Sequence, residues 1–273
     1  MSRSYTFGAE HFGRAIKNPA YDDKRFAGVR DRLHAFLEVQ RNDYLPDGVK
    51  TLDRIERALA WAIEAHRKQW RPDGSPYIMH ILDVASAVSS WYRGLDDDVV
   101  IAALLHDALE DCPEYLAARA SEHARASAEP ARAAIEEHFG AGVLELVEAV
   151  TNPDFEAEIK RDHGFTKHTP EYNAVLVARY ATHFVEIFTH APLGASAIKI
   201  SDFLDNATQL DKVASDPVRY PWFVRKYGPC VKFLIDFLPR HDGADHPIKG
   251  AVEIALPRLE EAWAKYYAPG APS

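Results

Sequence analysis

The sequence predicts an all-α protein, a helical bundle with helical extensions at both ends, and three observations support this. Apolar residues recur three and four positions apart through most of the chain, as they do on one face of a helix. The apolar-polar alternation typical of strands is nearly absent, and no hairpin pattern is found. Clusters of Pro, Gly, Asn and Asp separate the periodic segments, as expected for short loops between helices.

The periodic segments give the expected helices in chain order. The first begins near Leu52 and carries Ile55, Leu59, Ala62 and Ile63 on one face. The same spacing predicts helices over residues 84–91, 99–109, 131–139, 143–150, 175–188 and 231–238. Further helices are expected over 24–40 in an N-terminal extension, and over 223–238 and 251–266 in C-terminal helices.

Breaks between these helices are marked by loop residues. The segment 72–76 is a Pro-Asp-Gly-Ser-Pro loop, Gly94 ends one helix, and the run of three Asp at 96–98 begins the next. Phe139-Gly140 and Asn152-Pro153 end two more. Residues 112–130 are expected to form an exposed helical insertion, and residues 153–171, rich in charge and His, a long surface loop.

Composition excludes several classes of protein. The chain of 273 residues is 47% hydrophobic and 27% charged, which is typical of a globular protein. With 32 basic and 41 acidic residues, the net charge is −9, so no basic field for extended nucleic acid is present. The two cysteines predict a reducing, cytoplasmic location, and no apolar run is long enough to span a membrane.

The most informative segment is His106-Asp107-Ala108-Leu109-Glu110-Asp111. On one helix, residues three and four apart share a face, so His106 with Glu110 and Asp107 with Asp111 would form one charged stripe. Clustered carboxylates repel one another and raise one another's pKa unless a cation lies among them. The segment therefore favours a divalent metal.

A His-Asp pair supplies two ligands, so others must come from elsewhere in the chain. His80 follows the 72–76 loop, and Asp202 lies in an apolar stretch with Asn206 one turn later. Imidazole and carboxylate ligands suit Mn²⁺, Fe²⁺ or Zn²⁺, and the oxygen-rich set favours Mn²⁺. A single His-Asp pair occurs often by chance, and the ordered combination of the three sites is what indicates a metal centre.

This ordered pattern resembles the HD superfamily of metal-dependent phosphohydrolases, and within it the (p)ppGpp hydrolase branch, the RelA/SpoT hydrolase domain and the small alarmone hydrolases. The resemblance runs over about residues 55–210. It rests on the stretches Ala65-His66-Arg67-Lys68-Gln69, Pro76-Tyr77-Ile78-Met79-His80, Ala102 to Asp111, His138-Phe139-Gly140, Leu146 to Thr151, His190-Ala191-Pro192 and Ala197 to Asp202 with Asn206.

The resemblance implies a domain plan and a metal site. Residues 51–215 would form an HD-type metallohydrolase core, with residues 1–50 as the N-terminal helical extension and residues 216–273 as C-terminal helices packing on it, in one globular domain. One ion, expected to be Mn²⁺, would be bound by His80, His106, Asp107 and Asp202. Glu110 and Asp111 would orient and deprotonate the attacking water, which releases pyrophosphate from the 3′ position of an alarmone nucleotide.

The substrate residues implied by the resemblance are Arg71, beside the nucleobase, Tyr77 and Asn206, in the nucleoside pocket, and Lys199, near the site. The basic residues Lys160, Arg161, Lys167 and His168 could attract a polyphosphate but are interpreted as ordinary surface.

The chain departs from the family pattern at Pro72, Ile81, Phe203 and Thr208. None of these departures removes a metal ligand or the Glu-Asp pair. Several fall around the base and ribose, so an adenine alarmone, (p)ppApp, is a serious candidate substrate beside (p)ppGpp.

Two other functions stay open at this point. One is a different HD phosphohydrolase, acting on dNTPs, cyclic nucleotides or NADPH. The other is a non-catalytic binding module of the same fold, which predicts lost ligands although all six key positions are kept. A toxic alarmone synthetase is a possible partner, and the sequence does not indicate an oligomeric state.

Overall fold

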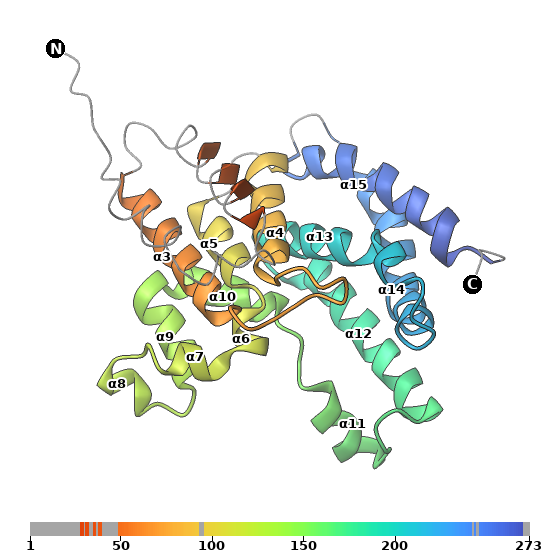
Figure 1. The fold of residues 1–273 in the computed structure, drawn as a ribbon, viewed down its shortest axis with the longest axis horizontal. Helices are drawn as coiled ribbons and strands as arrows, with labels where there is room; N and C mark the ends of the chain where they lie inside the picture. Colours follow the sequence, from red (N-terminus) through yellow and green to blue (C-terminus); the bar gives the residue numbers. More distant parts are fainter. Residues whose placement is uncertain are drawn as a thin grey trace.

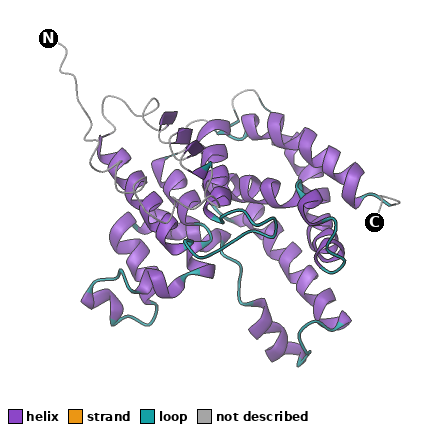
Figure 2. Cartoon of the chain, in the orientation of Figure 1, coloured by secondary structure: helices purple, strands orange, loops and turns teal. Residues whose placement is uncertain are grey.

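The computed structural model describes residues 49–92, 96–241, 243 and 246–269, together with residues 28, 29, 31, 32, 35, 36, 38 and 39. Over these residues the chain is helical, and the strand-like feature found there is an isolated bridge between Trp70 and Pro76. Figure 2 shows these helices joined by loops. The all-α prediction is confirmed.

The helices follow the order expected from the sequence, with several short ones between the long ones (Figure 1). They are α3 (Val49–Ala65), α4 (Ile78–Trp91), α5 (Asp97–Leu105), α6 (Ala108–Asp111), α7 (Pro113–Ala117), α8 (Glu122–Arg125), α9 (Pro130–Phe139), α10 (Ala141–Val150), α11 (Phe155–His163), α12 (Pro170–His190), α13 (Leu193–Ala207), the 3₁₀ turn η3 (Leu210–Val213), α14 (Arg219–Phe237), the 3₁₀ turn η4 (Leu238–His241), α15 (Lys249–Ala262) and the π turn η5 (Trp263–Tyr267).

Helix α5 lies at the centre of one half of the bundle because it is apolar on every side. All residues from Val99 to Leu105 are buried, and a helix that is hydrophobic all round must be enclosed by others. Its start is capped by Asp96, whose carboxylate accepts a hydrogen bond from the amide of Asp98 at 3.0 Å. The enclosed helix therefore delivers the residues that follow it, His106 and Asp107, into the interior.

Arg54 of α3 fixes the start of α5. Its guanidinium donates to Asp97 at 2.8 Å, to Asp98 at 2.6 Å and to the carbonyl oxygen of Phe139 at 2.6 Å. One planar cation thus joins α3, the N-terminus of α5 and the end of α9. The ion pairs account for Asp97 and Asp98, and the cap accounts for Asp96, whereas the sequence indicates only that a helix begins at 96–98.

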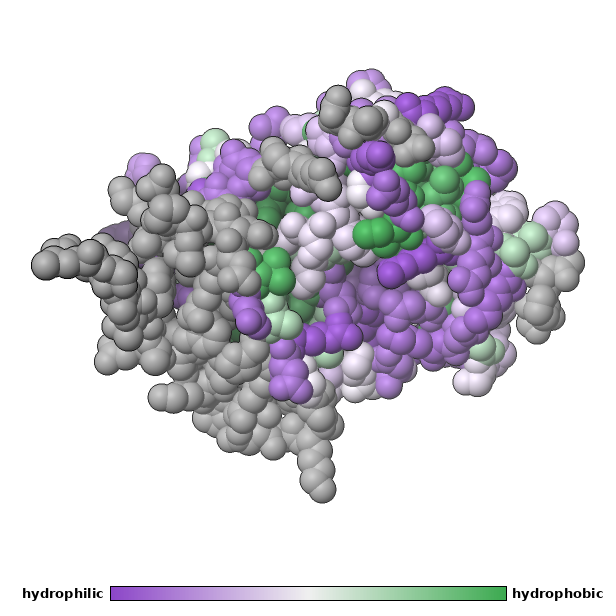
Figure 3. Space-filling view, turned by 90° about the horizontal axis from the view of Figure 1, so that it is seen from above, coloured by the Kyte–Doolittle hydropathy of each residue, from purple (hydrophilic) through white to green (hydrophobic). Residues whose placement is uncertain are grey.

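Two hydrophobic clusters form the core, and α13 contributes to both. Ala195 and Ile198 pack with α3, α4, α5 and α10, whereas Ile200, Phe203 and Leu204 pack with α12, α14 and α15. Figure 1 shows α13 in the middle of the molecule between these two groups of helices. Seen from above, the described surface is largely hydrophilic, with hydrophobic residues in separate groups (Figure 3).

Two expectations about local structure are wrong. The helix expected over 99–109 is interrupted at His106-Asp107, where α5 ends and the short α6 begins. The long loop expected over 153–171 contains the nine-residue helix α11, capped by Asp154 and ended by Gly164 in the left-handed conformation. The sequence did not indicate this helix because it is rich in charged residues and has no apolar face, since only Ile159 on it is buried.

Other expectations about helices are confirmed, or fall on residues that the structure does not describe. The insertion at 112–130 holds α7 and α8, and the C-terminal helices are α14 and α15. The helix expected over 24–40 falls mainly outside the described residues. Those described there are helical except for Gly28, which lies in a turn, and Val29 and Phe36 are buried. The boundaries 1–50, 51–215 and 216–273 stay a prediction.

Replacing Gly250 by Ala tests how closely α15 packs on the end of α4. Helix propensity alone would make the substitution stabilising by about 1 kcal/mol. A Cβ at Gly250 would instead overlap the backbone carbonyl of Trp91, which has no rotamer to adopt. We expect a net loss of about 1–3 kcal/mol, read as a lower midpoint of thermal unfolding.

The matched control is Gly228→Ala in α14, where the new Cβ would meet Tyr267 at an ordinary 3.5 Å. This variant should unfold at the wild-type temperature or above it. Equal midpoints for the two variants would contradict the close packing of α15 on α4.

Candidate metal centre and active site

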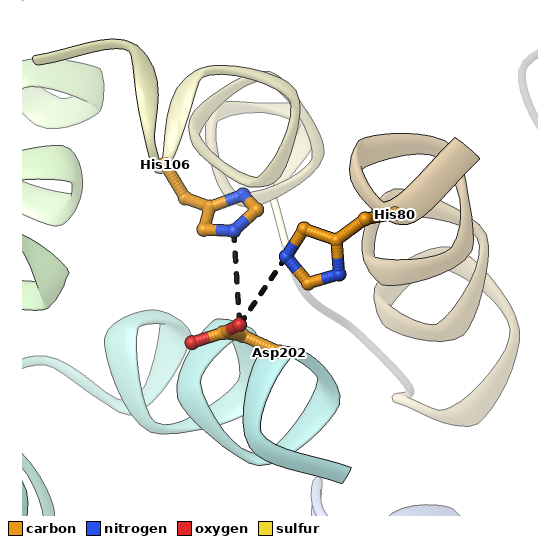
Figure 4. A group of neighbouring side chains, drawn as sticks. All are labelled: His80, His106 and Asp202. Carbon is orange, nitrogen blue, oxygen red and sulfur yellow. Dashed lines mark ion pairs between the residues drawn. The ribbon is translucent and has the colours of Figure 1, made fainter. Parts of the chain in front are cut away.

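Three helices bring the expected metal ligands to one point. His80 lies in the first turn of α4, His106 and Asp107 follow α5, and Asp202 lies in α13. Figure 4 shows His80, His106 and Asp202 pointing toward one another from these separate elements. One possible ligand atom from each of His80, His106 and Asp202 lies within 4.8 Å of those of the other two residues. Residues more than 120 positions apart in the sequence thus meet in the interior.

The donor atoms are spaced as ligands of one ion. The Nε2 atom of His80 lies 3.3 Å from Oδ1 of Asp202 and 3.5 Å from Oδ2 of Asp107. The Nε2 atom of His106 lies 3.1 Å from Oδ2 of Asp107 and 4.0 Å from Oδ1 of Asp202. Two ligands bound at ~2.1 Å and at a right angle are ~3 Å apart, so small adjustments would complete a coordination shell.

Both imidazole rings are held by their other nitrogen. Nδ1 of His80 lies 2.7 Å from Oδ2 of Asp205, and Nδ1 of His106 lies 2.8 Å from the carbonyl oxygen of Ala103. Because both partners are acceptors, each Nδ1 carries the proton and donates it. When the rings are neutral, this leaves the lone pair of each Nε2 facing the shared point, which is the usual arrangement of metal-binding histidines.

The two Nε2 atoms also test whether a metal fits. Both are buried and have no hydrogen-bond partner, although buried polar atoms are almost always satisfied. The side chains of His80 and His106 are only 1% and 3% exposed. Two unsatisfied nitrogens facing two carboxylates in a buried site fit a divalent cation.

Asp107 is positioned by its backbone and by Tyr77. The interruption between α5 and α6 leaves Asp107 at φ −96° and ψ −8°, a sparsely populated region where many active-site residues are found. The hydroxyl of Tyr77 donates to Oδ2 of Asp107 at 2.6 Å. The break in the helix therefore turns the carboxylate toward His80 and His106 instead of leaving it on a continuous stripe.

The site is strongly coupled electrostatically. Burial alone would lower the pKa of His80, but the carboxylates of Asp107, Asp202 and Asp205 hold that pKa well above its ordinary value. Burial would raise the pKa of Asp107, and His106 and His80 hold it well below its ordinary value. In the absence of an ion, protons on the imidazoles thus balance the carboxylates, and a bound cation would replace them.

Lys199 and Asn206 contact the expected ligand Asp202 directly. The ammonium of Lys199 lies 3.1 Å from Oδ2 of Asp202, and Nδ2 of Asn206 donates to Oδ1 at 2.7 Å. Lys199 is buried, and its pKa is raised, because the attraction of Asp202 outweighs the effect of burial. Both residues, expected near the substrate, thus also fix the orientation of this carboxylate.

Glu110 and Asp111 lie on α6, beside Asp107, and both are exposed. Glu110 accepts hydrogen bonds from the backbone amide of Asn152 at 3.2 Å and from its side chain at 2.9 Å. Burial of part of the side chain, with the charges of Asp107 and Glu110, raises the pKa of Asp111 to about 6. Two acids therefore stand at the solvent side of the buried donor set.

A pocket opens beside the metal ligands, and three of the four expected substrate residues line it: Arg71, Tyr77 and Asn206. Lys199 is buried behind Asp202 instead. Arg71 is 11% exposed and forms an ion pair with Asp205, so its guanidinium is held in place. The complete lining is Trp70, Arg71, Pro72, Asp73, Tyr77, Asn206, Gln209, Leu210, Lys212, Val213, Phe223 and Tyr227.

Sequence reasoning missed Asp205 and Asn152. Asp205 contacts His80, Arg71 and Gln209, and His80 and Arg71 lower its pKa to about 2 despite burial. Its spacing was a usable signal, because Asp202, Asp205, Asn206 and Gln209 follow helical spacing on α13. Asn152 gave no signal beyond its position in a helix-ending Asn-Pro pair.

The class of protein is an HD domain, because the family model described as HD domain matches residues 58–174 of this all-α bundle. The chain is 30% identical over 162 residues to mouse guanosine-3′,5′-bis(diphosphate) 3′-pyrophosphohydrolase MESH1, covering 58% of this chain and 70% of the relative. The human protein of that name matches equally. The chain belongs to the HD-domain family that contains MESH1.

Longer bacterial proteins also match. The Aquifex aeolicus guanosine-3′,5′-bis(diphosphate) 3′-pyrophosphohydrolase is 38% identical over 99 residues, 36% of this chain but 12% of that relative. The chain therefore spans only a small part of such proteins. A solved structure titled as a metazoan ortholog of SpoT that hydrolyzes ppGpp covers 77% of this chain and 93% of its own, at 23% identity and a TM-score of 0.44, too weak a similarity to add to these matches.

Replacing Asp205 by Asn should weaken metal binding without removing a ligand. The change removes the charge that fixes the ring of His80, and losses of this kind are about 10- to 100-fold in metal affinity. Titration calorimetry with Mn²⁺ measures it. The control is Asp236→Asn, which makes the same chemical change at an exposed ion pair with Lys232. Equal affinities in both variants would contradict the orienting role.

Metal affinity should fall on acidification. The pKa values of His80 and His106 are raised, so these rings hold their protons more tightly and a cation must displace them. Between about pH 6 and pH 8 we expect Mn²⁺ affinity to rise with pH, with proton release visible as a dependence of the binding enthalpy on the buffer. An affinity independent of pH would exclude the imidazoles as ligands.

Proposed function

We propose that this protein hydrolyses the 3′-diphosphate of an alarmone nucleotide, (p)ppGpp or (p)ppApp, to a nucleoside 5′-phosphate and pyrophosphate in a metal-dependent reaction. The observation that carries the proposal is the pair of buried, unpartnered Nε2 atoms facing Asp107 and Asp202 beside two exposed acids. The names of the relatives supply the substrate class, since MESH1 is named a guanosine-3′,5′-bis(diphosphate) 3′-pyrophosphohydrolase.

His80, His106, Asp107 and Asp202 would hold the ion. When bound there, a divalent metal lowers the pKa of water and polarises a phosphoryl oxygen. Asp205, Ala103 and Tyr77 keep the donor atoms in place, so little reorganisation is needed on binding. Buried, pre-oriented ligands of this kind make the site selective for an ion with mixed nitrogen and oxygen coordination.

Glu110 and Asp111 would orient the attacking water and accept its proton. Both lie one turn beyond the donor set and face solvent, and a general base must have access to water. Asn152 fixes the Glu110 carboxylate through two hydrogen bonds, which leaves Asp111, with its raised pKa, as the better proton acceptor. The bond from phosphorus to the ribose 3′-oxygen then breaks, and that oxygen takes up a proton.

The nucleoside would occupy the pocket beside Arg71, Tyr77 and Asn206. Its aromatic walls, Phe223 and Tyr227 among them, offer flat surfaces for a base. The polar groups nearby are already engaged: Arg71 and Gln209 with Asp205, and Lys212 with Asp73. A pocket whose donors are occupied discriminates weakly between guanine and adenine, which supports both alarmones as substrates.

Three finer points belong to the proposal. Mn²⁺ is favoured among divalent ions because two of the four ligands are carboxylates. The free cysteines Cys112 and Cys230, both buried, support a reducing compartment such as the cytoplasm. None of the described helices is long and apolar enough to cross a membrane. A synthetase partner stays a prediction.

The direct test is hydrolysis by the purified protein. With Mn²⁺ it should release pyrophosphate from ppGpp or ppApp, and EDTA should abolish this. Changing both Glu110 and Asp111 to Ala should lower kcat by about 10²- to 10⁴-fold and leave Mn²⁺ bound, whereas Asp107→Ala should lose both. Glu114→Ala, an exposed neighbour on α7, is the control.

The choice of substrate decides between the candidate functions. Comparable kcat/KM values on ppGpp and ppApp are expected from the occupied donors of the pocket. Turnover of dNTPs, cyclic nucleotides or NADPH with neither alarmone hydrolysed would replace the proposal by another HD phosphohydrolase activity.

A further inference from the structure

Gln69, in the loop between α3 and α4, joins three parts of the chain around the site. Its side-chain oxygen lies 2.5 Å from Nδ1 of His66, and its side-chain nitrogen lies 3.6 Å from Sγ of Cys112. Its backbone carbonyl oxygen accepts the N–H of Tyr77 at 3.1 Å. Residues 65–69 belong to the stretches that resemble the HD superfamily, but none of them is a proposed ligand. One residue thus links the end of α3, the start of α4 and the end of α6.

Cys112 connects Gln69 to the two acids of α6. It directly follows Asp111, where α6 ends and α7 begins, and it is only 8% exposed. Its thiol donates to the carbonyl oxygen of Ala65 at 3.3 Å and accepts from the side-chain amide of Gln69. Helix α6 has four residues, too few to be stable alone, so contacts at its end determine where Glu110 and Asp111 lie.

His66 connects Gln69 to Asp107 through Tyr77. The imidazole of His66 is buried, and its ring centre lies 5.2 Å from that of Tyr77. Because the side-chain oxygen of Gln69 can only accept, Nδ1 of His66 carries the proton and donates it, which fixes the ring against Tyr77. The hydroxyl of Tyr77 in turn donates to Asp107 at 2.6 Å. The side chain of Gln69 therefore supports the tyrosine that orients a proposed metal ligand.

We propose that Gln69 is a positioning residue for the hydrolysis, which holds α6 through Cys112 and Tyr77 through His66. This inference rests on the proposed function. Gln69 does not line the pocket, so it acts through these other residues. An acid that accepts a proton from the attacking water must lie within hydrogen-bond reach of it, and a misplacement of about 1 Å costs about 100-fold in rate. The contacts of Gln69 keep Glu110 and Asp111 within this tolerance.

The first test compares Cys112→Ala and Cys112→Ser with the control Cys230→Ala. Cys230 is also a buried free cysteine, but it lies in the hydrophobic cluster around α14. Cys112→Ala should lower kcat for ppGpp by about 10-fold, with KM and Mn²⁺ affinity within about twofold of wild type. A hydroxyl both donates and accepts, so Cys112→Ser should recover part of kcat. Cys230→Ala should match wild type, and equal kcat in the two alanine variants would overturn the proposal.

The second test uses Gln69→Met, which removes both side-chain hydrogen bonds at a similar side-chain volume. We expect kcat to fall by about 10- to 100-fold. Combined with Cys112→Ala, the loss should be smaller than the product of the two single losses, because both changes break the same contact. Losses that multiply fully would show that the two residues act separately, and would overturn the proposal. If Gln69→Met does not fold, the Cys112 variants decide alone.

Hydrogen exchange distinguishes failure of this inference from failure of the proposed function. The amides of Asp111 and Cys112 donate to the carbonyl oxygens of Asp107 and Ala108 at 2.8 and 3.0 Å. In Cys112→Ala and Gln69→Met, exchange in α6 should be roughly fivefold faster, with α13 unchanged. If wild type hydrolyses no alarmone, the proposed function fails, and exchange still tests the contacts of Gln69. Exchange in α6 at the wild-type rate would reject the positioning role.

Discussion

The buried meeting of two imidazole nitrogens with the carboxylates of Asp107 and Asp202 is the constraint on which the rest of the site depends. In a low-dielectric interior such a group of charges is stable only when each one is balanced. Lys199 and Asn206 bind one carboxylate, Tyr77 binds the other, and Asp205 binds His80. The arrangement nevertheless leaves the Nε2 atoms of both histidines without a hydrogen-bond partner, which is the observation that supports the proposed cation site.

The surrounding helices have the form they have because of this requirement. An entirely apolar α5 carries His106 into the core, and its interruption at Asp107 redirects a carboxylate that a continuous helix would have left elsewhere. In the proposed reaction, the exposed acids of α6 have the access to water that proton transfer needs, whereas the donor atoms behind them are buried away from water. Burial of the proposed ligands and exposure of the two acids are thus achieved by His106-Asp107 and Glu110-Asp111, which lie close together in the sequence.

Much of this could be predicted from sequence, for reasons that also explain the failures. The proposed ligands His80, His106, Asp107 and Asp202 follow or interrupt apolar stretches of the sequence, where ionisable residues are conspicuous. Periodicity gave the long helices but missed α11, which buries a single residue, and the break after α5, where His106 keeps helical dihedral angles and Asp107 departs from them. Asp205 shares the helical spacing of Asp202, but its partners His80 and Arg71 lie outside α13, and no local pattern in the sequence indicates them.

The position of α13 between the two hydrophobic clusters has a mechanical consequence. One face of this helix belongs to the core around α5 and the other to the core around α14, while Asp202 lies on the seam. Sliding of one half against the other would therefore separate Asp202 from the two histidines. The packing of the two clusters against each other and the geometry of the proposed ligands are therefore coupled. A local opening anywhere between the clusters would displace Asp202 from the two histidines.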